Sequence, residues 1–186
     1  KEQVLDAYPE LCGLNITIPY KKEVLDFLDD RSALPLDACN CIKMSKGKLK
    51  GFNTDVIGFE ESLKPLLLSS HSPALVLGTG GAAEAVVFVL EKLRIPYSIA
   101  SRSSSPKTVD YQSMDAGFIA AHKLIINTTP LGTYPDTETC PPIPYDGVGA
   151  DHYLFDLVYN PPETKFLREG ARRGATIKNG SDMLII

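Results

Sequence analysis

A glycine-rich segment in the middle of the chain constrains the fold most strongly. The apolar run Ala74–Leu77 is typical of a strand buried on both faces of a sheet, and it leads directly into Gly78-x-Gly80-x-x-Ala83 and then a helical pattern. This order is the context that a dinucleotide-binding fingerprint requires. The glycines permit a tight turn and close approach of the backbone, and the helix N-terminus attracts phosphate. The segment therefore predicts a dinucleotide site, with a plain glycine turn as the alternative.

Strand and helix patterns alternate after this segment, which indicates a parallel α/β sheet. The expected elements are strands over 97–100, 123–127, 154–158 and 176–177, and helices over 83–93 and 165–173. The first third has a different texture. It predicts a strand over 14–18, a helix over 22–28, a hairpin of strands 39–45 and 48–53 turning at Lys46-Gly47, and a helix over 55–68. Residues 69–73 read as a linker, so we expect two domains, 1–70 and 71–186.

Composition excludes several classes of protein. The net charge of −4 argues against nucleic-acid binding, and no apolar run approaches the ~18 residues of a membrane helix. The four cysteines, Cys12, Cys39, Cys41 and Cys140, lack the spacing of a zinc site, so we expect structural thiols and no metal. No targeting segment is visible, and we expect a cytoplasmic protein.

The end of the second predicted strand of the sheet indicates which dinucleotide binds. An NAD site expects Asp or Glu here to bind the ribose hydroxyl, but the strand ends in Ser101-Arg102-Ser103. Arg102 can pair with a 2′-phosphate, the two serine hydroxyls add neutral donors, and Lys107 adds charge. The pattern favours NADP over NAD, with a solvated surface arginine as the alternative.

Two polar segments in the first third lie at predicted strand ends, where ligands bind in α/β proteins. Asn15 and Thr17 share one face of a strand, with Lys21 just beyond it. The second segment is Asn53-Thr54-Asp55, which precedes a helix. Capping of that helix and catalysis explain the second segment equally well.

These segments resemble motifs of the shikimate dehydrogenases. Residues 13–21 are similar to G-x-N-V/I-T-V/I-P-F/Y-K, residues 51–58 to G-x-N-T-D-x-x-G, and residues 78–82 to G-x-G-G-A. Further matches follow in the family's order: 101–103 for N-R-T, 127–132 for N-T-T-P-L-G, 156–164 for D-x-x-Y-x-P-x-x-T, and 179–184 for the start of D/N-G-x-x-M-L-x-x-Q. The resemblance covers essentially the whole chain.

The resemblance implies NADPH-dependent reduction of 3-dehydroshikimate to shikimate, with a small-molecule substrate and a monomer or homodimer. It implies an incomplete N-terminal α/β substrate domain followed by a Rossmann-like, doubly wound parallel-sheet domain. Lys21 matches the catalytic lysine and Asp55 its partner. Thr17, Asn40 and Tyr159 match substrate-binding positions, whereas Asn15 braces its strand; for Asn40 a turn role is the alternative.

The resemblance also assigns the cofactor-binding residues. They are the loop residues Gly78, Gly80, Gly81 and Ala82, the adenosine-phosphate residues Ser101, Arg102 and Ser103, Thr128 near the ribose, and Gly180 and Met183 beside the nicotinamide. Core packing is the alternative for Met183, because methionine commonly fills gaps.

The match departs from the family pattern at both ends. The family's S-x-S pair does not precede Lys1, and its closing glutamine would fall just past Ile186. We therefore expect the central two-thirds of a longer enzyme. The alternatives are an NAD-dependent quinate/shikimate dehydrogenase, disfavoured by Arg102, and a non-catalytic binding module, disfavoured by the presence of both Lys21 and Asp55.

Overall fold

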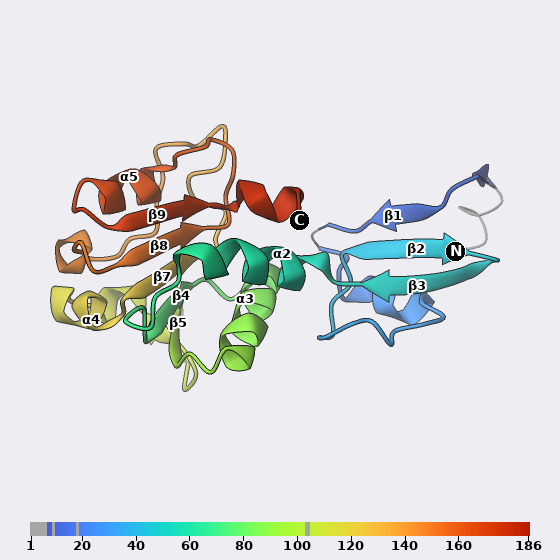
Figure 1. Cartoon of the computed structure of the whole chain (residues 1–186), viewed down its shortest axis with the longest axis horizontal. Coiled ribbons are helices and arrows are strands. Elements are labelled where there is room, and N and C mark those ends of the chain that lie inside the picture. Colours follow the sequence, from blue (N-terminus) through green and yellow to red (C-terminus); the bar gives the residue numbers. More distant parts are fainter. Residues whose placement is uncertain (1–6, 9, 18, 103–104) are drawn as a thin grey trace. The chain divides into compact units, whose positions relative to one another are not determined.

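The structure, a computed structural model, describes residues 7–8, 10–17, 19–102 and 105–186. It divides into two compact units, 1–57 and 58–186 (Figure 1). Helix α2 (Thr54–Leu63) begins in the first unit and ends in the second. The division of function between domains 1–70 and 71–186 stays a prediction.

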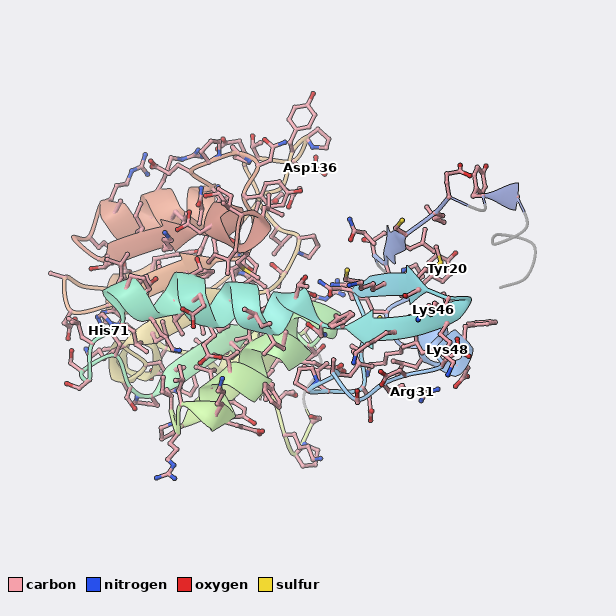
Figure 2. The ribbon with its side chains drawn as sticks, turned by 45° about the vertical axis from the view of Figure 1, so that its right-hand side comes forward. Tyr20, Arg31, Lys46, Lys48, His71 and Asp136 are labelled. Carbon is pink, nitrogen blue, oxygen red and sulfur yellow. The ribbon has the colours of Figure 1, made fainter. Side chains whose placement is uncertain are left out.

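The first unit is built on an antiparallel sheet of order β1-β2-β3. Its strands are β1 (Gly13–Asn15), β2 (Cys41–Ser45) and β3 (Lys48–Phe52). The predicted hairpin is confirmed: Lys46 and Gly47 both have positive φ, 50° and 73°, as a two-residue turn that matches the strand twist requires. Lys46 in the turn and Lys48 just after it are both exposed (Figure 2). Of the predicted strand over 14–18, Leu14 and Asn15 pair with β2, together with Gly13; Ile16 and Thr17 lie outside the strand, and Ile18 lies outside the described residues.

Cys39 lies at the centre of a small core in this unit. It is fully buried with Ile42 and Leu49, and Leu28 packs against them. The Cys39 thiol donates to the carbonyl of Cys41 (3.3 Å), and burial raises its pKa. Leu28 follows the 3-10 helix η1 (Glu23–Phe27), which stands where the sequence predicted an α-helix. Buried in this way, Cys39 has the packing role expected of it. In the described residues, no three His, Cys, Asp or Glu residues are grouped so that they could hold a metal ion.

The second unit contains a six-stranded sheet of order β6-β5-β4-β7-β8-β9, parallel throughout. Its strands are β4 (Ala74–Leu77), β5 (Tyr97–Ser101), β6 (Val109–Asp110), β7 (Leu124–Asn127), β8 (Tyr153–Asp156) and β9 (Thr176–Asn179). The helices are α3 (Gly81–Lys92), α4 (Ala116–Ala121) and α5 (Lys165–Ala171), with 3-10 segments η2 (Lys64–Leu66), η3 (Tyr111–Ser113), η4 (Tyr145–Gly147) and η5 (Gly180–Leu184). This strand order is that of the doubly wound dinucleotide-binding fold, as predicted.

Both faces of this sheet are covered, which explains its uninterrupted apolar strands. On one face Leu75 and Leu154 pack with Ile119 of α4 and Phe166 of α5. On the other face Phe59 of α2 meets Phe155 edge to face, with ring centroids 5.1 Å apart. The chain leaves the central strands β4 and β7 in opposite directions, and the crevice at their carboxyl ends is where such folds bind ligands. In the part of the chain described, no helix is long and apolar enough to cross a membrane.

Candidate active site

Lys21 and Asp55 form an ion pair in the first unit. The Lys21 ammonium lies 2.6 Å from Asp55 Oδ2. Both side chains are largely buried, with 19% of Lys21 and 27% of Asp55 exposed. Lys21 follows a turn in which the amide of Tyr20 donates to the carbonyl of Thr17 (2.9 Å), and the carbonyl of Lys21 accepts from the amide of Cys39 (2.8 Å). These backbone bonds hold the lysine beside the start of α2. The pair combines a cation, a proton and a carboxylate in one partly buried position.

The neighbouring Asn53 performs the capping role that the sequence left open. Its Oδ1 accepts from the amide of Val56 (3.3 Å), as an N-cap residue does. Its Nδ2 donates to the carbonyl of Ala38 (2.9 Å), and the side chain is buried. Because Asn53 caps α2, the carboxylate of Asp55 is available to Lys21. The structure therefore separates capping and chemistry between two residues of one motif.

Asn40 orients the other oxygen of Asp55. Its Nδ2 donates to Asp55 Oδ1 and to Thr54 Oγ1, both at 2.9 Å, and its Oδ1 accepts from the amide of Thr54 (2.8 Å). Both amide hydrogens are thus used within the protein, which leaves an oxygen lone pair for a ligand hydroxyl. Sequence reasoning missed Thr54 as a partner of Asn40, and the two residues are 14 positions apart.

The remaining predicted substrate residues are exposed. Thr17 lies at the turn before Lys21, with its side chain at the surface. Tyr159 belongs to the second unit and is 51% exposed. Substrate binding by Thr17, Asn40 and Tyr159 stays a prediction. So does the bracing of the strand by Asn15, which pairs through its backbone with Cys41.

The glycine loop has the room and the donors that a pyrophosphate needs. Gly78 has φ +111°, a conformation that favours glycine, and a Cβ there would lie 2.8 Å from Thr128 Oγ1. Among the residues that the structure describes, a Cβ on Gly80 or Gly81 would meet no atom within 4 Å, and no side chain caps the start of α3. Ala83 is buried where the helix approaches the sheet. The residues present therefore fit a dinucleotide, with phosphate at free N–H groups.

Thr128 joins the ends of the two central strands. Its amide and its hydroxyl both donate to the carbonyl of Leu77, at 3.0 and 2.7 Å. This places Thr128 directly against Gly78, at the switch point of the sheet. These hydrogen bonds fix Thr128 beside the glycine loop, while its predicted position near a ribose stays a prediction.

The end of β5 presents a cation and no carboxylate of its own. Arg102 is exposed immediately after β5, and Lys107 is exposed in the following segment. The strand-end carboxylate of the neighbouring β6, Asp110, instead accepts from the amide of Gln112 (2.8 Å). Ser101 ends β5, and Ser103 lies outside the described residues. This arrangement suits the 2′-phosphate of NADP.

Gly180 and Met183 lie in η5, after β9. A Cβ on Gly180 would lie 2.3 Å from the carbonyl oxygen of Leu157, so this position admits no side chain without a shift of the backbone. The backbone of Met183 lies against Gly58 of α2, where an added Cβ would meet its oxygen at 3.0 Å. Both residues therefore have packing roles in the second unit, and their proximity to a nicotinamide stays a prediction.

Comparisons with known proteins agree with this geometry. Residues 2–42 match the family model described as the shikimate dehydrogenase substrate binding domain. The shikimate dehydrogenase (NADP(+)) of Methanosphaera stadtmanae is 34% identical over 93% of this chain and 68% of its own length. The solved shikimate 5-dehydrogenase of Thermus thermophilus, in complex with NADP(H) and shikimate, is 30% identical with a TM-score of 0.83, over 98% of this chain and 72% of that one. A quinate dehydrogenase of Corynebacterium glutamicum in complex with NAD has 27% identity and a TM-score of 0.83, over 99% and 73%.

Proposed function

Because this chain belongs to the shikimate dehydrogenase family, we propose that it reduces 3-dehydroshikimate to shikimate with NADPH. The observation that carries this proposal is the ion pair of Lys21 and Asp55, 2.6 Å apart, in a chain that also has a complete glycine loop on β4 and α3. The first supplies acid–base chemistry and the second a place for the cofactor. A binding module would need only the loop.

The chemistry of carbonyl reduction explains the need for this pair. Bound NADPH supplies a hydride to the carbonyl carbon, and the carbonyl oxygen then gains negative charge. The Lys21 ammonium stabilises this charge and holds a proton within reach, while Asp55 orients the ammonium. We assign proton transfer to the pair as a unit. Asn40 fixes Asp55 through Oδ1, which leaves Oδ2 for the lysine.

The cofactor preference follows from the end of β5. Arg102 is exposed there and Asp110 is held in a cap, so the position offers positive charge to a 2′-phosphate. The loop Gly78, Gly80, Gly81 and Ala82 takes the pyrophosphate, with Ser101, Ser103 and Thr128 on the adenosine and ribose side and Gly180 and Met183 on the nicotinamide side. Thr17, Asn40, Asp55 and Tyr159 bind the substrate. We assign the substrate-binding domain to residues 1–70 and the cofactor-binding domain, which also contributes Tyr159, to residues 71–186, in a cytoplasmic enzyme that is a monomer or a homodimer.

The test is a steady-state assay of the purified protein with 3-dehydroshikimate and either NADPH or NADH. We expect turnover with NADPH and a much lower kcat/KM with NADH. Equal kcat/KM values for the two cofactors would instead indicate an NAD-type quinate/shikimate dehydrogenase. Binding of NADPH without turnover would indicate a non-catalytic module.

A further inference from the structure

Asp156, at the end of β8, is a buried carboxylate to which the proposed function gives no role. It has no exposed surface, and within the described ranges it forms no ion pair shorter than 4 Å. Three groups donate to it: Thr164 Oγ1 to Oδ2 (2.5 Å), and Asn127 Nδ2 and the amide of Val158 to Oδ1 (2.9 and 3.0 Å). Burying a carboxylate without a cation is costly, so these bonds must fix it firmly.

The bonds continue from Asp156 to the loop that follows β7. Asn127 Oδ1 accepts from both the amide and the hydroxyl of Thr129, at 3.0 and 2.6 Å. Thr129 Oγ1 in turn accepts from the amide of Leu131 (3.3 Å). The methyl group of Thr129 lies 3.0 Å from where a Cβ on Gly78 would be. The hydrogen bonds therefore connect Asp156 through Asn127 and Thr129 to the backbone of Leu131, in the loop that follows β7.

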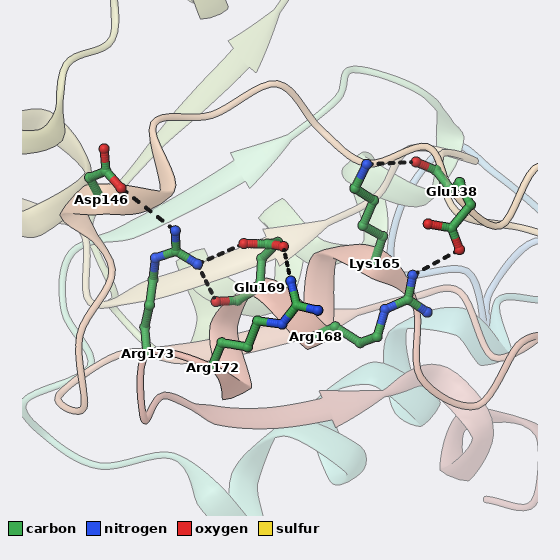
Figure 3. Close-up of polar contacts among 7 residues, drawn as sticks. All are labelled: Glu138, Asp146, Lys165, Arg168, Glu169, Arg172 and Arg173. Carbon is green, nitrogen blue, oxygen red and sulfur yellow. Dashed lines mark hydrogen bonds and ion pairs between the residues drawn. The ribbon is translucent and has the colours of Figure 1, made fainter.

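Helix α5 is joined to these hydrogen bonds through Thr164, the residue that caps it. Thr164 caps α5 by accepting from the amide of Leu167 (3.4 Å), and its Cβ lies 3.2 Å from where a Cβ on Gly132 would be. The next turn of α5 holds Glu138 of the β7–β8 loop: Lys165 donates to its carbonyl and Arg168 to its carboxylate, both at 3.0 Å (Figure 3). The position of α5 and that of the loop are thus set together.

We propose that Asp156, with Asn127 and Thr129, is a positioning residue for the nicotinamide half of the dinucleotide site. The inference rests on the proposed function. In this fold each half of the sheet binds one mononucleotide. The glycine loop on β4 and Arg102 after β5 belong to the first half, which takes the adenosine side. The loop after β7 therefore borders the other mononucleotide. Asp156 positions this loop through Asn127 and Thr129 and does not itself contact the mononucleotide.

The test measures binding of two ligands by the purified full chain: NADPH, and adenosine 2′,5′-bisphosphate, which occupies only the adenosine half. Asp156→Asn keeps the shape but replaces the short bond to Thr164 by a neutral one. Thr129→Val removes the hydroxyl bond to Asn127 but keeps the amide bond, and Thr129→Ser retains both. We expect Asp156→Asn and Thr129→Val to raise the Kd of NADPH by roughly 3- to 10-fold and to leave that of the bisphosphate unchanged. Thr129→Ser should bind both ligands as the wild type does.

The control variant is Asp151→Asn, which changes a carboxylate just before the opposite end of β8, paired with Lys123 at 2.5 Å. It should bind both ligands normally. The inference is wrong if Thr129→Val binds NADPH like the wild type, or if both ligands weaken equally, which would indicate a general loss of structure. Failure of the wild-type protein to bind NADPH would instead contradict the proposed function, so the two failures are distinguishable.

Discussion

Asp55, at the start of α2, holds the ammonium of Lys21 at 2.6 Å, although the two residues are 34 positions apart in the chain. Asn53 caps the helix and Asn40 occupies the second oxygen of Asp55. The carboxylate is thereby fixed on both sides. The ion pair is the centre of the proposed chemistry, and it gives the first prediction.

Replacement of Lys21 by alanine removes the charge and proton that a developing alkoxide needs. We expect kcat to fall by ~10²-fold or more with little change in KM for 3-dehydroshikimate, because the interaction develops in the transition state. Steady-state kinetics with NADPH measure this. Lys48→Ala, at the exposed β2–β3 hairpin (Figure 2), is the matched control and should leave kcat unchanged. A kcat near that of the wild type would remove Lys21 from the mechanism.

Replacement of Arg102 by alanine tests the cofactor preference. We expect KM for NADPH to rise by ~10-fold or more and KM for NADH to change little, since only NADPH carries the 2′-phosphate. NADH serves as the internal control for folding. Equal changes in KM for both cofactors would show that Arg102 does not bind the 2′-phosphate.

Two glycines of the cofactor half should respond oppositely to alanine. Gly80 has φ −80° and open space around its Cβ position, so Gly80→Ala should retain the wild-type Tm but weaken NADPH binding, because the methyl group occupies the path of the phosphates. At Gly180 the added carbon would lie 2.3 Å from the carbonyl oxygen of Leu157. Gly180→Ala should therefore lower stability by about 1–3 kcal/mol. Thermal unfolding and NADPH titration of both variants check this, and a stable Gly180→Ala would contradict it.

Loss of the Asn53 side chain should destabilise the protein. Asn53→Ala removes the cap of α2 and leaves the buried carbonyl of Ala38 without its donor, so we expect a cost of about 1–3 kcal/mol. Urea unfolding measures the change. The exposed Asn160→Ala is the control and should be nearly neutral. An Asn53→Ala variant as stable as the wild type would show that the cap contributes little.

Asp156 should make stability depend on pH below neutrality. Burial raises its pKa to about 6 from 3.8, so the folded state holds more protons than the unfolded state between these values. Stability due to this group therefore falls as pH rises from about 4 to 6, by roughly 3 kcal/mol. Asp156→Asn should remove this dependence. His71 acts in the opposite sense, because burial lowers its pKa. Comparing variant and wild type at each pH cancels its effect, and an identical pH profile would contradict the prediction.

The sequence alone determined the features that depend on neighbours in the chain. The strand, loop and helix over residues 74–92 and the turn at Lys46-Gly47 follow from local patterns, because glycine conformation and apolar runs act over a few residues. Short elements escaped this reasoning. Strand β6 has two residues, and α4 has six, with a cap by Asp115, so neither contains enough periods to detect.

Only the tertiary structure decided which polar residue caps α2 and which one pairs with Lys21. Asn53, Thr54 and Asp55 are equivalent candidates for a cap in the sequence, and the choice depends on what lies across from each. Asn53 donates to the carbonyl of Ala38, the amide of Thr54 donates to Asn40, and Lys21 donates to Asp55. Likewise Asp156 is an ordinary strand-end carboxylate in the sequence. Its burial raises its pKa, and the hydrogen bonds from Asn127 and Thr164 give it a positioning role to test. Hydrogen bonds are selected by proximity in space, which the order of residues does not state.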